Sequence, residues 1–335
     1  MVSANDIEVG FQDFCLGSIS FDEFAIRLFN FQARENTIYR EYLSLINRDA
    51  QKILSTEQIP FLPINFFKNH KIVTTDYVEE QVFSSSSTTG QIPSKHYIRS
   101  LAHYTENTVR LFEKKLGRIS DKIVIGLLPS YLERNDSSLV CMVDHFVKMT
   151  SNELSGFHLY DHDQLHGVLE SASQSREEVI LFAVRYALLE LAEQYELDLS
   201  HVTIIETGGM KGKRGPVSNE ELKNIVVQKL KPRSLISEYG MTELLSQAYS
   251  DDDFLFTTPD SMQVFITELN DPFCHMKEGR TGQINIIDLA NLYSCAFIAT
   301  DDLGVKYGED KFRVLGRMDN SEQRGCNLLV ADVIT

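Results

Sequence analysis

A stretch rich in serine and threonine has the residue types that bind phosphate. Ser84 to Thr89 are six consecutive hydroxyl residues, and Gly90 follows them. Small side chains let backbone N–H groups approach an anion, and hydroxyls add further donors. The stretch lies between a predicted strand at 78–83 and a predicted helix at 98–116, which favours a phosphate-binding loop. A flexible Ser-rich linker is the alternative interpretation.

A second candidate for chemistry is the sequence Glu-Tyr-Gly-Met-Thr-Glu at 238–243. A short strand at 235–237 leads into this tight turn. Tyr239 offers a flat face to a nucleotide base, and Glu243 offers the hard oxygen ligand that Mg²⁺ prefers. Taken alone, the pattern also fits an ordinary strand-to-helix turn with a capping Thr and Glu.

Two further segments carry charged residues suited to a nucleotide. Asp302 lies in Thr-Asp-Asp-Leu-Gly at 300–304, and Arg317 lies in Gly-Arg-Met-Asp-Asn at 316–320. A carboxylate can accept from both hydroxyls of a ribose, and an arginine can bind phosphate with two parallel hydrogen bonds. Solvated β-turns are the alternative, because Asp, Asn and Gly are common there.

Several well-known catalytic patterns are missing from the chain. It contains no G-x-G-x-x-G, H-E-x-x-H or G-x-S-x-G. The segment 208–214 comes near a phosphate-binding P-loop, but only three residues separate Gly208 from Gly212. Arg214 also stands where that loop needs Ser or Thr to hold magnesium. We therefore reject the P-loop interpretation.

The spacing of apolar residues predicts the helices and strands that position these candidate residues. Helical spacing and the N-cap Ser20 predict helices in the first third of the chain, which Pro60 and Pro63 end. Further helices are expected at 137–149, at 177–195 behind an apparent capping box Ser175…Glu178, and from 218 to Pro232. The apolar runs at 123–128 and 202–205 predict buried strands. Additional strands are expected at 263–269, 283–289, 296–299 and 311–315.

This order of elements predicts an α/β core followed by a strand-rich subdomain. We expect three segments: a helical segment at 1–76 packed on the core, an α/β nucleotide-binding core at 77–255, and a β-rich subdomain with a short C-terminal tail at 256–335.

Composition narrows the possible functions. The chain has 335 residues, 32 Lys+Arg against 48 Asp+Glu, and a net charge of −16. This acidic balance, without a basic stripe, argues against a nucleic-acid binder. The chain contains no apolar run of 18 residues, so the sequence predicts no membrane-spanning helix. The five cysteines are scattered with no C-x-x-C, which predicts reduced thiols in the cytoplasm and no structural zinc site.

The candidate segments 84–90, 238–243, 300–304 and 316–320 follow one another in an order and spacing that resembles the motifs of the adenylate-forming superfamily. This superfamily includes acyl-CoA synthetases, luciferases and adenylation domains. Within it, the run 236–249 (Ile-Ser-Glu-Tyr-Gly-Met-Thr-Glu-Leu-Leu-Ser-Gln-Ala-Tyr) and the ending 324–328 (Arg-Gly-Cys-Asn-Leu) look most like the LuxE-type acyl-protein synthetases. The resemblance extends from about residue 78 to the C-terminus. It implies the large-domain architecture of that superfamily, mixed α/β layers with a small β-rich subdomain, without its mobile C-terminal domain and the lysine of that domain.

The resemblance also implies roles for individual residues. The β- and γ-phosphates of ATP would be held by Ser86, Ser87, Thr88, Thr89 and Gly90. The adenine site would be formed by the backbone of Gly208 and Gly209 and by the stacking ring of Tyr239, followed by Gly240. Thr242 would contact the α-phosphate and Glu243 would hold Mg²⁺. Asp302 would bind the ribose, Arg317 would contact ribose or phosphate, and Cys326 would carry the acyl group.

The implied activity is ATP-dependent activation of a fatty or other carboxylic acid as an acyl-adenylate, with transfer to a protein cysteine that feeds an acyl reductase partner. Magnesium and the phosphate-binding donors would stabilise the charge that develops during the displacement. Arg324 beside Cys326 favours the reactive thiolate. One alternative is an acid–CoA ligase resembling phenylacetate–CoA ligase. Another is a non-catalytic, nucleotide-binding partner of an acyl reductase.

Overall fold

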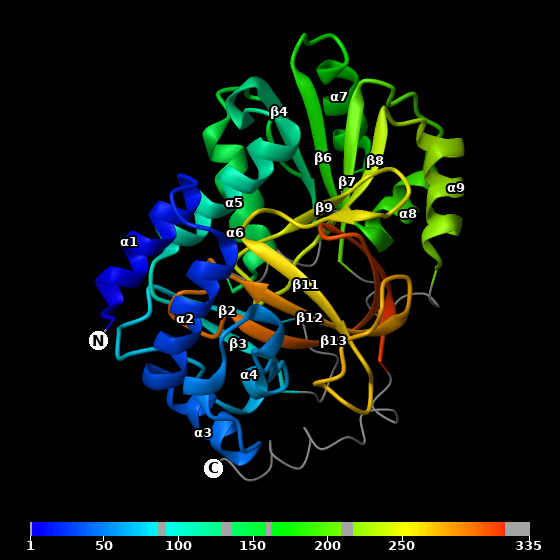
Figure 1. Cartoon of the computed structure of the whole chain (residues 1–335). Helices are drawn as coiled ribbons and strands as arrows, with labels where there is room; N and C mark the ends of the chain where they lie inside the picture. The colour runs from blue at the N-terminus through cyan, green and yellow to red at the C-terminus, as the bar shows by residue number, and fades with distance from the viewer. Residues whose placement is uncertain (1, 86–91, 129–135, 159–161, 209–216, 319–335) are drawn as a thin grey trace. The chain divides into compact units, whose positions relative to one another are not determined.

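The computed structural model describes residues 2–85, 92–128, 136–158, 162–208 and 217–318, and these residues form two compact units (Figure 1). Unit 1 contains residues 1–104, 242–246 and 258–335, and unit 2 contains residues 105–241 and 247–257. Helix α5 (Leu101–Leu116) begins in unit 1 and continues into unit 2.

Unit 2 contains a sheet in the strand order β10-β9-β8-β7-β6-β4-β5. Its strands are β4 (Lys122–Leu127), β5 (Gly156–Phe157), β6 (Glu178–Val184), β7 (Val202–Thr207), β8 (Ser234–Tyr239), β9 (Ala248–Ser250) and β10 (Phe256–Thr257). Strands β4 to β8 pair in parallel, and β9 and β10 continue the sheet antiparallel. Figure 1 shows β6, β7 and β8 side by side.

The parallel strands form from continuous apolar sequence because helices cover both faces of the sheet. On one face, Phe112 of α5 contacts Phe146 of α6 (Ser138–Met149) and Phe182 of β6, with ring centroids 5.0 and 6.1 Å apart. On the other face, α8 (Arg185–Gln194) packs on β6 and β7. The strands at 123–128 and 202–205 are confirmed, each extended or shifted by one or two residues.

One predicted helix is wrong. The segment 177–195 is strand β6 followed by helix α8, joined directly at Val184. Ser175 accepts a hydrogen bond from Glu177 N at 3.2 Å, so it makes a local turn before a strand and does not cap a helix. The run from Val179 to Val184 is buried along its whole length, which an apolar strand at the centre of a sheet requires.

Two other helices of unit 2, α6 (Ser138–Met149) and α9 (Asn219–Leu230), begin and end within two residues of where the sequence predicts them. Helix α7 (His162–Ala172) was not predicted. Ser137 and Ser218 cap α6 and α9 by accepting from Val140 N and Glu221 N. Lys231 takes the left-handed conformation that ends α9 just before Pro232.

Unit 1 contains an antiparallel meander in the order β11-β12-β13-β14, with β1 (Leu62–Pro63) parallel to β13. Its strands are β11 (Met262–Thr267), β12 (Thr281–Asp288), β13 (Phe297–Tyr307) and β14 (Lys311–Arg317). A separate pair joins β2 (Gln81–Ser84) to β3 (Lys95–Ile98). The strand-rich end of the chain is therefore as expected, with β12, β13 and β14 longer than predicted and β11 one residue shorter.

The helices of unit 1 are α1 (Ala4–Cys15), α2 (Phe21–Glu35), α3 (Thr37–Leu45) and α4 (Phe66–Asn69). Short 3₁₀ turns occur at Ala50–Lys52 and Thr56–Gln58, and in unit 2 at Ile119–Asp121. None of the helices in the described residues is long and apolar enough to cross a membrane.

Helix α2 packs on the meander through its apolar face. Phe24, Leu28 and Phe29 are fully buried, and the ring of Phe29 lies 5.7 Å from that of Phe297 on β13. Gln32 adds a specific polar contact: its Nε2 donates to Asn291 O at 2.7 Å, and its Oε1 accepts from Ala296 N at 2.9 Å. The N-terminal helices therefore belong to the same core as the strands near the end of the chain.

Candidate functional site

The candidate residues fall into three groups. Seven of them lie outside the described residues: Ser86, Ser87, Thr88, Thr89, Gly90, Gly209 and Cys326. Gly208, Tyr239 and Gly240 lie in unit 2. Thr242, Glu243, Asp302 and Arg317 lie in unit 1.

In unit 2, the candidates follow the carboxyl ends of two neighbouring parallel strands. Gly208 follows β7 directly and has φ = 75°, a conformation that favours glycine. Tyr239 ends β8 and is 8 % exposed, with its ring 5.7 Å from that of Phe256. The ends of parallel strands are where open α/β sheets bind ligands.

Gly240 permits a close approach within the same turn. A Cβ atom on Gly240 would lie 2.2 Å from Glu238 Oε1, so any side chain there would displace this carboxylate. The requirement for glycine therefore comes from the packing of Glu238 against the turn.

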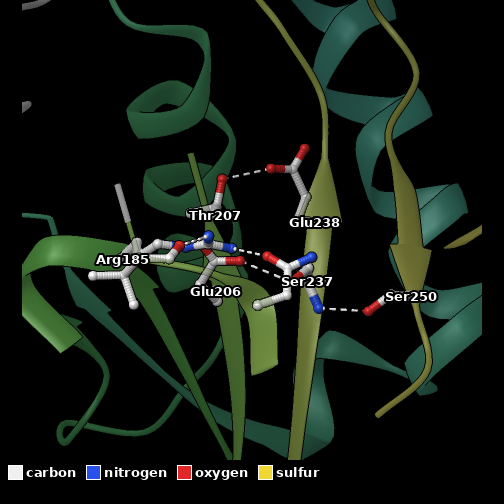
Figure 2. Close-up of polar contacts among 8 residues, drawn as sticks. Arg185, Glu206, Thr207, Ser237, Glu238 and Ser250 are labelled. Atoms are coloured by element: carbon white, nitrogen blue, oxygen red, sulfur yellow. Dashed lines mark hydrogen bonds and ion pairs between the residues drawn. The ribbon is translucent and has the colours of Figure 1, made fainter. Parts of the chain in front are cut away.

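The structure adds two carboxylates that the sequence analysis did not single out, Glu206 on β7 and Glu238 on β8 (Figure 2). Arg185 Nε donates to Glu206 Oε1 at 2.8 Å, and Ser237 Oγ donates to Glu206 Oε2 at 2.8 Å. Thr207 Oγ1 donates to Glu238 Oε2 at 2.6 Å. The available signal was a glutamate near the end of each strand, after the apolar pairs Ile204-Ile205 and Leu235-Ile236.

The two carboxylates occupy different environments. Glu206 is 3 % exposed and is neutralised by Arg185. Burial raises the pKa of Glu238 to about 7, the Thr207 hydrogen bond opposes this, and the nearby Glu206 adds to it. Near neutral pH, Glu238 therefore exists in both charged and neutral forms.

In unit 1, the main chain of Thr242 and Glu243 is held by two buried side chains. His96 Nδ1 lies 2.8 Å from Thr242 O, and Asn291 Nδ2 donates to Glu243 O at 2.8 Å. Burial lowers the pKa of His96 to about 4, so the ring is neutral at pH 7. Because a carbonyl only accepts, Nδ1 carries the proton, and Nε2 accepts from Ser294 Oγ at 2.8 Å.

Asp288 holds the next residues of this segment. Its side chain is fully buried and accepts from Leu245 N, Ser246 N, Ser246 Oγ and Ala290 N at 2.6 to 3.1 Å. Burial raises the pKa of the Asp288 carboxyl, and these hydrogen bonds oppose the rise. His96 on β3, and Asp288 and Asn291 at and just after the end of β12, thus fix the backbone of 242–246 from two other parts of unit 1.

The Glu243 side chain is compatible with a magnesium ion. It is 4 % exposed, and burial raises the pKa of its carboxyl, against a hydrogen bond from Ser94 and the charges of Arg317 and Lys68. A buried carboxylate gains from a nearby divalent cation. Mg²⁺ needs only one or two carboxylates when phosphates and water complete its shell. Among the described residues no three His, Cys, Asp or Glu side chains gather as a metal cluster.

Asp302 and Arg317 face each other across neighbouring strands. They are paired in the register of β13 and β14, and Arg317 Nε lies 3.4 Å from Asp302 Oδ1. The Asp302 residue is 8 % exposed, whereas the Arg317 side chain is 80 % exposed. Residues 300–304 lie within β13, so the alternative that they form a β-turn is wrong. The pair presents a positive group to solvent above a carboxylate.

Comparison with known proteins gives matches among solved structures. No family model and no curated protein matches the sequence. The structure matches ATP-bound MatB from Rhodopseudomonas palustris (TM-score 0.53, 15 % identity, 72 % of this chain and 49 % of that chain). It also matches O-succinylbenzoate coenzyme A synthetase from Bacillus subtilis in complex with AMP (0.51, 18 %, 82 % and 53 %). A third match is 2-hydroxyisobutyryl-CoA ligase in an open conformation (0.64, 12 %, 89 % and 70 %).

These matches decide the architecture. The chain has the mixed α/β fold of the large domain of adenylate-forming enzymes. The predicted mixed α/β architecture is thereby confirmed. The chain spans about half the length of the first solved structures that it matches. At 12 to 20 % identity, the likeness concerns the fold alone.

Proposed function

We propose that this protein is an AMP-forming ligase that activates a fatty or other carboxylic acid with ATP and passes the acyl group to a protein cysteine. The observation that carries the proposal is the fold, shared with ATP-bound MatB and with O-succinylbenzoate coenzyme A synthetase bound to AMP, together with the rigidly held Thr242–Glu243 main chain. The LuxE-type resemblance of 236–249 and 324–328 supports a protein acceptor.

The reaction has two displacements. A carboxylate oxygen attacks the α-phosphorus of ATP, the bond from that phosphorus to the bridging oxygen breaks, and pyrophosphate leaves. A thiolate then attacks the acyl carbon, the bond to the adenylate oxygen breaks, and AMP leaves with that oxygen. Mg²⁺, when bound, would neutralise charge on the phosphates. The thiol proton goes to solvent or a nearby base.

In this proposal the described residues bind and orient the nucleotide. Thr242 contacts the α-phosphate, and Glu243 holds the magnesium ion. Tyr239 stacks on adenine next to the backbone of Gly208. Asp302 accepts from the ribose hydroxyls, and Arg317 is exposed enough to reach ribose or phosphate. Ser86 to Gly90 are proposed to hold the outer phosphates, Gly209 to line the adenine site, and Cys326 to carry the acyl group.

Intact-mass analysis after incubation with ATP, Mg²⁺ and a panel of carboxylic acids tests the proposal. We expect a mass increase equal to one acyl group, sensitive to neutral hydroxylamine, and lost in Cys326→Ser. Cys274→Ser is the matched control because Cys274 is an exposed free thiol. An acylated Cys326→Ser variant contradicts the carrier role. Glu243→Ala should abolish acid-dependent ATP–pyrophosphate exchange, and intact exchange contradicts the magnesium role.

An acid–CoA ligase is the second candidate, favoured because one matched structure is named as a coenzyme A synthetase and another as a CoA ligase. CoA-dependent formation of AMP without a self-acylated protein would select it. ATP binding without exchange would instead indicate a nucleotide-binding partner of an acyl reductase. The reductase partner and a cytoplasmic location are parts of the main proposal, the latter motivated by the scattered cysteines.

A further inference from the structure

A row of polar side chains crosses one face of the unit 2 sheet where its parallel strands end. Thr207 of β7 is paired with Glu238 of β8, and Glu238 is paired with Tyr249 of β9. Gln247 lies two residues before Tyr249, so it points to the same face. Tyr249 contacts Phe112 of α5, which places the row on the face that α5 covers. The neighbouring positions on this face, Phe182, Ile205 and Ile236, are apolar, so a polar row beside them needs a reason.

Gln247 contributes a buried acceptor without a partner. The residue is 3 % exposed, and its Nε2 donates to Thr108 O at 2.9 Å. Because a backbone carbonyl only accepts, the amide cannot be flipped. Gln247 Oε1 then has no hydrogen-bond partner within the described part of the chain. A buried carbonyl oxygen in this state is costly unless a ligand or water donates to it.

Glu238 contributes a second acceptor beside it. Figure 2 shows Thr207 and Glu238 pointing toward each other from neighbouring strands, with the hydroxyl bound to Oε2. The other oxygen, Oε1, lies over the Cα atom of Gly240. A Cβ built there would be 2.2 Å from Glu238 Oε1 and 3.7 Å from Gln247 Cβ. Glu238 is half-buried and Gly240 is exposed, so this spot is open to a ligand.

The carboxylate of Glu206 on the neighbouring strand cannot accept a hydrogen bond at this spot. Glu206 is on the opposite face of the sheet, and its two oxygens already accept from Arg185 and Ser237. Arg185 is itself fixed by Asn219 Oδ1 at 2.8 Å. The structure therefore saturates one carboxylate and leaves acceptor capacity near the other.

We infer that Thr207, Glu238 and Gln247 form a subsite for a hydrogen-bond donor, a hydroxyl or amino group carried by the carboxylic acid that the protein activates. The inference rests on the proposed function and narrows its substrate from plain alkyl acids to hydroxy or amino acids. A site built to bind a substrate hydroxyl discriminates strongly against the analogue without it, because its own polar groups are then left unpaired.

ATP–pyrophosphate exchange with matched acids tests this subsite. The panel pairs butanoate, octanoate and dodecanoate with their 2-, 3- and terminal hydroxy and amino derivatives. We expect at least one derivative to exceed its alkyl parent in kcat/KM by about tenfold or more. Gln247→Met, which keeps the volume, should bring that ratio close to one. Glu238→Gln should lower the ratio for amino derivatives more than for hydroxy derivatives, because the amide keeps an acceptor but loses the charge.

Gln228→Leu on the exposed side of α9 is the control and should leave the ratio unchanged. If alkyl acids drive exchange at least as well as every derivative, this inference is overturned while the proposed function stands. If no acid drives exchange, the proposed function fails. The subsite is then judged by calorimetric titration of the same acid pairs: a preference for a derivative that Gln247→Met removes supports it, and equal affinities overturn it.

Discussion

Replacing Asp288 with alanine should destabilise the protein more than replacing any other polar side chain that holds the segment carrying Glu243. Asp288 is fully buried and accepts four hydrogen bonds, three of them from the backbone N–H groups of Leu245, Ser246 and Ala290. Alanine leaves these three donors buried without a partner. Each unpaired donor costs about 1–3 kcal/mol, and removing the buried Asp288 carboxylate recovers part of this cost. We therefore expect the unfolding free energy to fall by about 3–6 kcal/mol.

Asparagine at the same position gives a graded comparison. Its carbonyl oxygen can accept from Leu245 N and Ser246 N, and its amide can donate to Ser246 Oγ, which already contacts Ser261 Oγ at 2.9 Å. Only Ala290 N then loses its partner. We expect a loss of about 1–3 kcal/mol for Asp288→Asn.

Urea unfolding followed by far-ultraviolet circular dichroism and tyrosine fluorescence measures both losses. Asp310→Asn is the control, since Asp310 is exposed, and should change the unfolding free energy by less than about 0.5 kcal/mol. A loss below about 1 kcal/mol for Asp288→Ala, or a larger loss for asparagine than for alanine, would refute the reasoning. Either result would mean that water or an alternative backbone geometry replaces these hydrogen bonds.

Three further predictions follow from single groups. His96→Leu removes the only ring that bonds Thr242 O within the described residues, so the KM for ATP in the exchange assay should rise at least about fivefold, and His96→Gln should restore part of it. Gly282→Ala puts a Cβ 2.2 Å from Thr267 O on the neighbouring strand, and the thermal midpoint should fall by several degrees. Folding raises the pKa of Glu238 from 4.5 to about 7, so the contribution of this group to the unfolding free energy is full below pH 4.5 and is lost as the pH rises to about 7. We expect the unfolding free energy to fall by about 1–2 kcal/mol over this pH range, because the group is half-buried. Glu238→Gln should make the unfolding free energy depend less on pH.

Local sequence signals predicted much of the fold. Ser137 and Ser218 cap helices, and Gly117 has the positive φ (80°) expected after α5. The apolar runs near 123–128 and 202–205 are central strands. The failure at 177–195 has a plain cause: an apolar run of this length fits a buried strand or a buried helix equally well, and the Ser175…Glu178 spacing tipped the prediction toward helix.

The candidate site was predictable only in part. Motif spacing identified the Tyr-Gly-Met-Thr-Glu segment but not what holds it, because His96, Asp288 and Asn291 lie more than 40 positions away along the chain. Local periodicity carries no information about such contacts. The same limit hid Glu238, whose partner Thr207 is 31 positions away on a neighbouring strand.

Transfer of oxygen-18 from the carboxylic acid tests the central claim most directly. The protein is incubated with ATP, Mg²⁺, an acid labelled in both carboxylate oxygens, and hydroxylamine to trap the activated acyl group. If the acid is activated as an acyl-adenylate, mass spectrometry should find one labelled oxygen in AMP and pyrophosphate without label. Label in inorganic phosphate together with ADP, or ATP consumption with unlabelled AMP, would contradict the account.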